Sequence, residues 1–163
     1  KLLILDVDGV LTDGGIYFDD NGTEHKKFDS QDGCGIKLLE LSGIDVAIIT
    51  ARSTQSVAHR LDTLGVKNYY HGIRDKSVAL KELSEKLSIS LSESAFVGDD
   101  VIDLPAMSKV ALPIAVANAH SFVKENALMV TKNTGGSGAV REVCDFLLKS
   151  QNKYDALMQS FLK

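Results

Sequence analysis

The feature that most constrains this chain is an apolar run at its start that ends in two aspartates, Leu2-Leu3-Ile4-Leu5-Asp6-Val7-Asp8-Gly9. An apolar run followed by glycine is typical of a strand buried on both faces of a parallel sheet. Carboxylates in such a strand are costly unless they are paired or bind a metal. Because Asp6 and Asp8 stand at the carboxyl end of the strand, where open α/β sheets bind ligands, they predict a functional site there.

Three interpretations of Asp6-x-Asp8-Gly9 compete. The pattern fits a polar strand end that turns into a loop, and it also fits a phosphoryl-transfer site with one attacking carboxylate and one proton-moving carboxylate. A calcium loop of the D-x-D-x-D-G type is excluded, because Val10 and Leu11 occupy its third acidic position and its glycine position.

Composition favours one ordinary globular domain over residues 1–163, with 44% hydrophobic and 25% charged residues. A net charge of −4 without a Lys/Arg cluster argues against a nucleic-acid partner, and no apolar stretch is long enough for a membrane span. Cys34 and Cys144 lie far apart without a CxxC spacing, so we expect free thiols in a cytoplasmic protein. The chain begins without Met inside its first strand, so we expect a short preceding segment.

Apolar runs and helical periodicity alternate along the chain. Further strands are expected at 45–49, 66–70, 94–97, 112–116 and 128–130. Helices are expected at 32–41, 53–64, 75–87, between the last two strands, and from about 139. Ser53 is the expected cap of the second of these helices. The segments 16–18 and 24–28 flank Asn21-Gly22 and predict a β-hairpin flap at about 14–28. The fold class is therefore α/β, a Rossmann-like parallel sheet with helices on both faces and no room for a cap domain.

Polar residues follow several of these strands and should meet at one edge of the sheet. They are Asp6, Asp8, Thr50, Lys76, Asp99, Asp100 and Asp103. Asp6 could attack a phosphate monoester to form an aspartyl-phosphate, and Asp8 could protonate the leaving oxygen and later deprotonate water. Clustered carboxylates need a cation, and oxygen ligands beside a phosphate favour Mg²⁺, held by Asp6, Asp99 and the Asp8 carbonyl. Thr50 and Lys76 would hold phosphoryl oxygens, and Asp100 and Asp103 would orient Asp99 or the metal's waters.

The segments DVDGVLTDG, IITAR, RDKS with Lys76, and VGDDVID resemble the four motifs of the haloacid-dehalogenase-type phosphatases. A wider match through FDSQDGCGIK, TARSTQSVAHR and GGSGAVREVCD is similar to the subgroup that acts on phosphorylated eight- and nine-carbon keto-sugar acids. This resemblance implies hydrolysis of 3-deoxy-D-manno-octulosonate 8-phosphate in lipopolysaccharide synthesis. It also implies a homotetramer in which each hairpin helps to close a neighbour's open site.

The resemblance implies substrate contacts as well. They are Asp8, Asp29, Ser30, Gln31, Asp32, Gly33, Lys37, Arg52, Arg60 and Lys76. Gln31 and Ser137 stand where the family usually has arginine, which affects contacts near them. Arg52 favours the eight-carbon substrate, since the branch acting on nonulosonate 9-phosphates tends to carry glutamate there. The alternatives are a phosphatase for such a nine-carbon substrate and a non-catalytic oligomerisation module, which the complete set of catalytic residues argues against.

Two further segments have open interpretations. Residues 134–138, Thr-Gly-Gly-Ser-Gly, either shape the rim of the site or simply lead into the helix that follows. The apolar stripe from Val143 to Leu162, in the C-terminal helix or tail at about 139–163, either packs on the chain's own sheet or reaches a neighbouring subunit.

Overall fold

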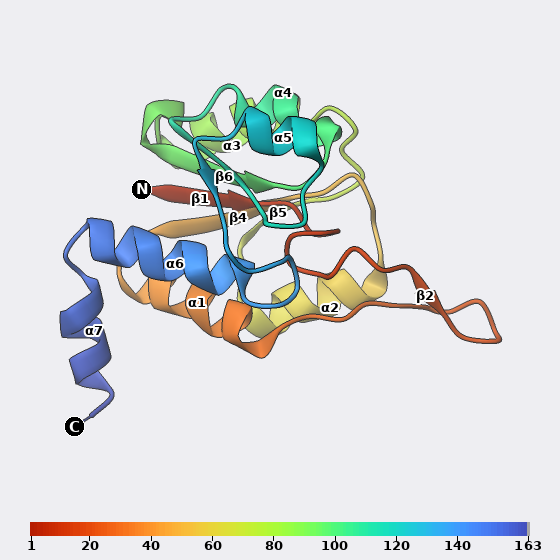
Figure 1. Cartoon of the computed structure of the whole chain (residues 1–163), viewed down its shortest axis with the longest axis horizontal. Coiled ribbons are helices and arrows are strands. Elements are labelled where there is room, and N and C mark those ends of the chain that lie inside the picture. Colours follow the sequence, from red (N-terminus) through yellow and green to blue (C-terminus); the bar gives the residue numbers. More distant parts are fainter. Residues whose placement is uncertain (163) are drawn as a thin grey trace.

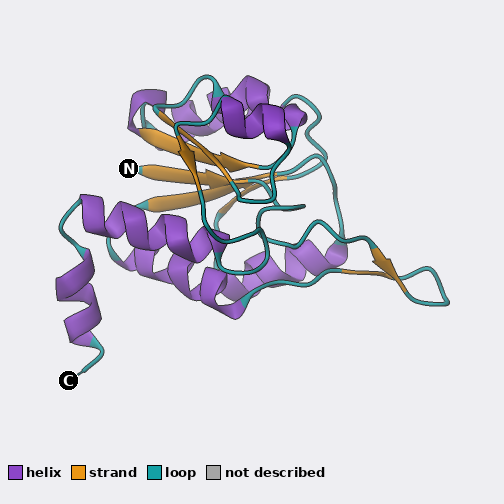
Figure 2. Cartoon of the chain, viewed as in Figure 1, coloured by secondary structure: helices purple, strands orange, loops and turns teal. Residues whose placement is uncertain are grey.

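A parallel sheet of six strands forms the centre of the molecule, in the order β5-β4-β1-β6-β7-β8 (Figures 1 and 2). The strands are β1 (Leu2–Leu5), β4 (Asp45–Ile49), β5 (Asn68–Tyr70), β6 (Ser94–Gly98), β7 (Leu112–Ala115) and β8 (Met129–Val130). Every pairing within this sheet is parallel. The computed structural model describes residues 1–162, so the last residue of the predicted tail lies outside the described residues.

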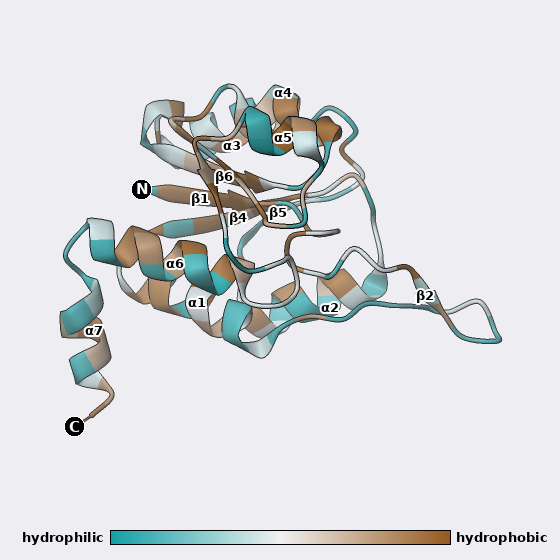
Figure 3. Ribbon diagram, in the orientation of Figure 1, coloured by the Kyte–Doolittle hydropathy of each residue, from teal (hydrophilic) through white to brown (hydrophobic). Residues whose placement is uncertain are grey.

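Helices cover both faces of the sheet, as the α/β prediction requires (Figure 1). One face carries α1 (Ser30–Leu41), α2 (Gln55–Leu64) and α6 (Ala139–Ser150), and the other carries α3 (Lys76–Leu87), α4 (Leu104–Met107) and α5 (Ser121–Glu125). The central strands are apolar along their length while the helices alternate apolar and polar stripes (Figure 3). A strand covered on both sides has no polar face, which is why β1 is entirely buried.

A two-stranded antiparallel hairpin of β2 (Tyr17–Phe18) and β3 (Glu24–His25) projects from the carboxyl edge of the sheet (Figure 1). It is shorter than predicted, and the Asp19–Thr23 turn closes it through hydrogen bonds to the Asp19 carboxylate. The hairpin lies within the predicted range of about 14–28, and its role as a flap stays a prediction.

Several boundaries differ from the prediction. Thr54, not Ser53, is the N-cap residue of α2, and β5 begins two residues late. The short helix α4 and the single-turn 3₁₀ helices η1 (Leu91–Glu93) and η2 (Val101–Asp103) were not predicted, because three or four residues are too short to show helical periodicity.

The C-terminal stripe forms two helices instead of one. Asn152 takes a left-handed conformation with φ 57°, which asparagine tolerates, and ends α6 before α7 (Tyr154–Ser160) begins. α7 packs on α6 through partly buried residues such as Tyr154 and Leu157, at the end of the molecule away from the hairpin (Figure 1). No helix among residues 1–162 has the length and apolar character needed to cross a bilayer.

Candidate active site

The carboxyl ends of β1, β4 and β6 bring the predicted residues together. Asp6 follows β1, Thr50 follows β4, Asp99 follows β6, and Lys76 is the first residue of α3. A cavity of about 170 Å³ lies at this edge, and its lining is Asp6, Asp8, Gly14, Thr50, Ala51, Arg52, Asp99, Asp100 and Ile102. The structure therefore brings these residues together at the carboxyl edge of the sheet, and their roles stay predictions.

Lys76 lies beneath this cavity, between two carboxylates. Its Nζ is 2.7 Å from Asp6 Oδ1 and donates a hydrogen bond of 2.6 Å to Asp103 Oδ1. Burial alone would lower the pKa of Lys76, but the two neighbouring carboxylates outweigh it and raise that pKa above its ordinary value. The lysine therefore remains a fixed positive charge below the site.

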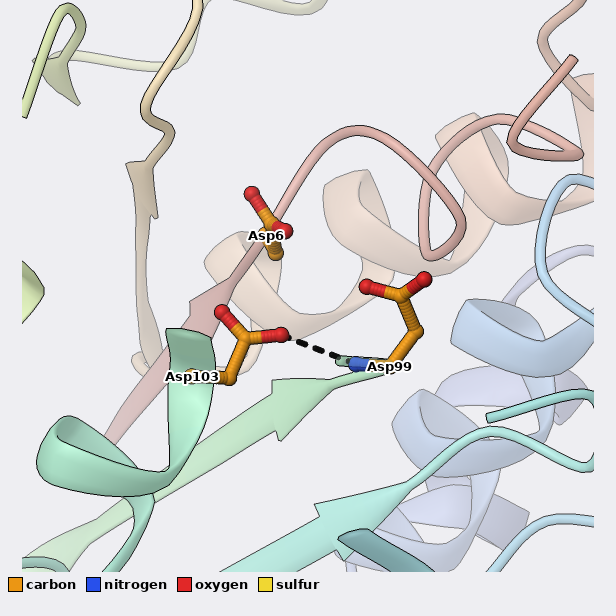
Figure 4. A group of neighbouring side chains, drawn as sticks. All are labelled: Asp6, Asp99 and Asp103. Carbon is orange, nitrogen blue, oxygen red and sulfur yellow. Dashed lines mark hydrogen bonds between the residues drawn. The ribbon is translucent and has the colours of Figure 1, made fainter. Parts of the chain in front are cut away.

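Three carboxylates face one another next to this single lysine. Asp6, Asp99 and Asp103 each offer an oxygen within 4.8 Å of the others (Figure 4). Burial first, and then the charge of Asp103, raise the pKa of Asp6 to about 7. Burial, followed by the charges of Asp103 and Asp6, raises the pKa of Asp99 to about 8. The cluster has more negative charge than Lys76 neutralises, which is the situation that a bound divalent cation relieves.

The hydrogen bonds show which of the three carboxylates has an oxygen atom available to bind a metal. Asp103 uses both, since Oδ1 accepts from Lys76 and Oδ2 accepts from the backbone N–H groups of Asp99, at 2.9 Å, and Asp100 (Figure 4). Asp6 Oδ1 is buried, and its contact with Lys76 lacks hydrogen-bond geometry. The oxygen donor set therefore fits Mg²⁺, with Asp6 and Asp99 as the available side-chain ligands and Asp103 as the group that orients Asp99.

The loop after β1 is held in shape by Thr12. Its hydroxyl oxygen lies 3.3 Å from the Val7 carbonyl, to which it donates, and it accepts from the N–H groups of Gly9 and Gly14. Gly9 has φ 83°, and a Cβ there would stand 2.0 Å from Asp99 Oδ2. Only glycine allows the backbone to approach the acidic cluster this closely.

The Thr134–Gly138 loop packs against the loop that follows β1. A Cβ on Gly135 would stand 1.7 Å from the Gly9 carbonyl oxygen, and Gly136 N–H donates to the Val10 carbonyl at 3.0 Å. Of the two interpretations left open, the loop therefore supports the walls of the site as well as leading into α6.

The hairpin supplies two charged residues that sequence reasoning missed. The Lys26 ammonium binds Asp8 Oδ1 and lies 3.0 Å from Glu24 Oε1, and Arg52 Nη2 donates to Glu24 Oε2 at 2.7 Å. One signal was available, because residues two apart on a strand share a face, and the predicted strand segment 24–28 therefore puts Glu24 and Lys26 on one side.

Several predicted substrate residues lie outside this cavity. Asp29 is the N-cap of α1, and Arg60 Nη2 donates to its carbonyl at 3.3 Å. Asp32 is buried, and its Oδ1 accepts from Arg141 N–H at 2.7 Å, at the start of α6. Lys37 lies toward the amino end of β4, beside Glu40. The chain's own cavity is therefore not lined by Asp29, Ser30, Gln31, Asp32, Gly33, Lys37 or Arg60, and their substrate contacts stay predictions.

Comparison with known proteins gives concordant results. Residues 70–143 match the model of the haloacid dehalogenase-like hydrolases. The chain is 52% identical over 155 residues to the 3-deoxy-D-manno-octulosonate 8-phosphate phosphatase of Escherichia coli K12, covering 95% of this chain and 82% of that protein.

Two crystal structures show the same fold. The 3-deoxy-D-manno-octulosonate 8-phosphate phosphatase of Yersinia pestis has a TM-score of 0.93 and 48% identity, over 94% of this chain and 83% of that one. That of Moraxella catarrhalis, in complex with a magnesium ion, a phosphate ion and a KDO molecule, has a TM-score of 0.96 and 45% identity, over 99% and 92%.

Proposed function

The chain belongs to the haloacid dehalogenase-like hydrolases, and on that premise we propose that it is a magnesium-dependent phosphatase. Its substrate is 3-deoxy-D-manno-octulosonate 8-phosphate, which it hydrolyses to the free sugar acid and phosphate. The observation that carries this proposal is the cluster of Asp6, Asp99 and Asp103 on Lys76 at one end of the cavity, in a chain that is 52% identical to a phosphatase of that name.

In the proposed reaction a carboxylate oxygen of Asp6 attacks phosphorus, and the bond from phosphorus to the sugar oxygen breaks. Asp8 donates a proton to the departing oxygen, and then takes one from the water that attacks the aspartyl-phosphate. The bond from phosphorus to the Asp6 oxygen breaks in that second step, which restores the Asp6 carboxylate and releases phosphate. Thr50 and Lys76 are the proposed partners of the phosphoryl oxygens.

Mg²⁺ would be held by Asp6, Asp99 and the Asp8 carbonyl, and it would neutralise charge on the carboxylates and the phosphoryl group. Asp103 fixes the backbone of Asp99 and the ammonium of Lys76 by its two oxygens. Asp100 caps η2 through its side chain and so holds the same turn.

Arg52 is the proposed partner of the substrate's carboxylate, because it lines the cavity and an arginine fork suits a carboxylate. Arg60 and the residues from Asp29 to Gly33, with Lys37, are proposed as further contacts. Since they lie outside this chain's own cavity, they would act in a site completed by another subunit.

A homotetramer in the cytoplasm, serving lipopolysaccharide synthesis, completes the proposal. The open cavity and the exposed side chains of Ile16, Tyr17 and Phe18 on the hairpin support an assembly that covers them. Sedimentation of the purified protein at several concentrations would show the tetramer's mass, and a monomer at every concentration would contradict it.

The proposed function is tested by phosphate release, with Mg²⁺ and with EDTA, from the eight-carbon keto-sugar acid phosphate, its nine-carbon relatives and common sugar phosphates. We expect metal-dependent release that favours the eight-carbon compound, and a loss of at least about a thousandfold in Asp6→Asn, about 4 kcal/mol of activation free energy. Asp62→Asn, on the exposed face of α2, is the control.

The other outcomes are distinct. A nine-carbon preference would keep the mechanism and replace the substrate. Folded protein that releases phosphate from no compound would favour the non-catalytic oligomerisation module instead.

A further inference from the structure

A buried ammonium at the base of the hairpin, that of Lys26, contacts Asp8 in the cavity of the same chain. The Lys26 side chain has no exposed surface, although lysine is rarely buried unless it is paired. Its two partners are Asp8 Oδ1 and, at 3.0 Å, Glu24 Oε1. An ammonium fully removed from water is held by these two carboxylates, so its position is fixed by them and theirs by it.

Asp8 has one oxygen in this contact and one outside it. Oδ1 binds Lys26, whereas Oδ2 has no hydrogen-bond partner among residues 1–162, and the side chain lines the cavity with about a quarter of its surface exposed (28%). The positive charge of the ammonium on Oδ1 disfavours an acidic proton on that same oxygen. A proton carried by Asp8 therefore lies on Oδ2, the oxygen that is free to face a substrate.

Glu24 fixes Lys26 in turn. Its Oε2 accepts from Arg52 Nη2 at 2.7 Å, and Arg52 belongs to the turn after β4. The ion-paired chain Asp8–Lys26–Glu24–Arg52 thus links the loop after β1 to the turn after β4 by way of the hairpin, and its two end residues line the cavity. Charged hydrogen bonds of this kind are stronger than neutral ones, and a connected set restricts the rotamers of all its members.

We propose that Lys26 is a positioning residue for Asp8, which holds Oδ1 so that Oδ2 presents its proton to the leaving oxygen of the phosphate ester. The proposal rests on the proposed function, because it requires Asp8 to act as the proton donor. Lys26 touches neither the phosphorus nor the nucleophile in this arrangement. It acts through Asp8, and Glu24 and Arg52 hold it in place.

The test uses two substrates that differ in their need for a proton. The sugar alcohol of a keto-sugar acid phosphate leaves only with a proton, whereas the phenolate of p-nitrophenyl phosphate leaves without one. We expect Lys26→Met to lower kcat/KM by about 100-fold for the sugar-acid phosphate and by less than about 5-fold for p-nitrophenyl phosphate. Lys27→Met, on the exposed neighbouring residue, should change neither, and Lys26→Arg should restore most of the lost activity.

Equal losses of kcat/KM for both substrates in Lys26→Met would show that Lys26 only supports the fold, and would overturn the proposal. Unchanged activity of Lys26→Met toward both substrates, as expected for Lys27→Met, would also overturn it. If Lys26→Met does not fold, Lys26→Gln and Lys26→Arg are compared instead, and failure of all three to fold also overturns it. A wild type that hydrolyses neither ester would contradict the proposed function itself, which distinguishes the two failures.

Discussion

Among single residues, Lys76 is a buried cation that lies between two carboxylates. Its ammonium contacts Asp6 and Asp103, and its side chain has no exposed surface. Removing one partner of a buried ionic group leaves the others as unpaired charges, which costs far more than the loss of an exposed ion pair. Lys76 therefore stabilises the folded chain as well as lying where the proposed phosphoryl group would bind.

We expect Lys76→Met to lower the free energy of unfolding by about 3–5 kcal/mol, because Asp6 and Asp103 lose their shared cation. Lys81→Met on the same helix is the matched control, since Lys81 is largely exposed and its pair with Glu85 at 3.9 Å contributes little. Urea unfolding in EDTA compares the two variants with the wild type. Similar midpoints for both variants would contradict this assignment.

At the scale of elements, the loop 134–138 and the loop after β1 are packed too closely for side chains between them. Gly135→Ala would place a Cβ 1.7 Å from the Gly9 carbonyl oxygen, so the backbone beside Asp99 must shift. We expect kcat/KM to fall at least about tenfold and stability to fall by about 1–3 kcal/mol. Thr134→Ala in the same loop changes an exposed residue and should match the wild type in both assays. Wild-type activity in Gly135→Ala would show that the loop does not support the site.

Helices α1 and α6 are joined by the Asp32 carboxylate. Burial first, opposed by backbone hydrogen bonds from α6, raises the pKa of Asp32 to about 6. Since the folded pKa lies above the unfolded value of 3.8, the folded state binds more protons between these values, and stability is lost as the pH rises through about 6.

Asp32→Asn removes this titration, because an amide stays neutral. We expect the melting temperature of Asp32→Asn minus that of the wild type to increase from pH 4.5 to pH 7.5. Calorimetry with Mg²⁺ present throughout measures this difference. Asp62→Asn, on the exposed face of α2, should show no such trend. A difference between Asp32→Asn and the wild type that does not change with pH would mean that Asp32 does not titrate in this range.

The sequence predicted the elements that are long and periodic, and missed those whose shape depends on tertiary contacts. Asp6, Thr50, Lys76 and Asp99 were expected together because parallel strands end at one edge, a rule that needs no coordinates. The contact of Lys26 with Asp8 had no such rule, since it depends on how the segment that follows β3 folds back onto the loop after β1. The break between α6 and α7 rests on one left-handed asparagine, which an apolar stripe does not reveal.

At the scale of the whole molecule, folding collects charge that the unfolded chain keeps apart. Asp6 follows the first strand of the sheet in sequence order, Asp99 and Asp103 follow the fourth, and the three meet beside one lysine. Burial and mutual repulsion raise the pKa values of Asp6 and Asp99, so the metal-free fold carries an electrostatic cost at neutral pH. A cation that binds only the folded cluster removes that cost and stabilises the whole chain.

We therefore expect Mg²⁺ at about 100 times its dissociation constant to stabilise the fold by about 2.7 kcal/mol. For a chain of this size that raises the melting temperature by about 5–10 °C over the value in EDTA. Asp99→Asn should lose most of this increment, because it removes a proposed ligand, whereas Asp62→Asn should keep it. NaCl at matched ionic strength separates specific binding from screening, since screening acts equally on all three proteins. An equal Mg²⁺ increment in Asp99→Asn and the wild type would place the cation elsewhere, and would leave the buried carboxylates to be stabilised by protons and Lys76 alone.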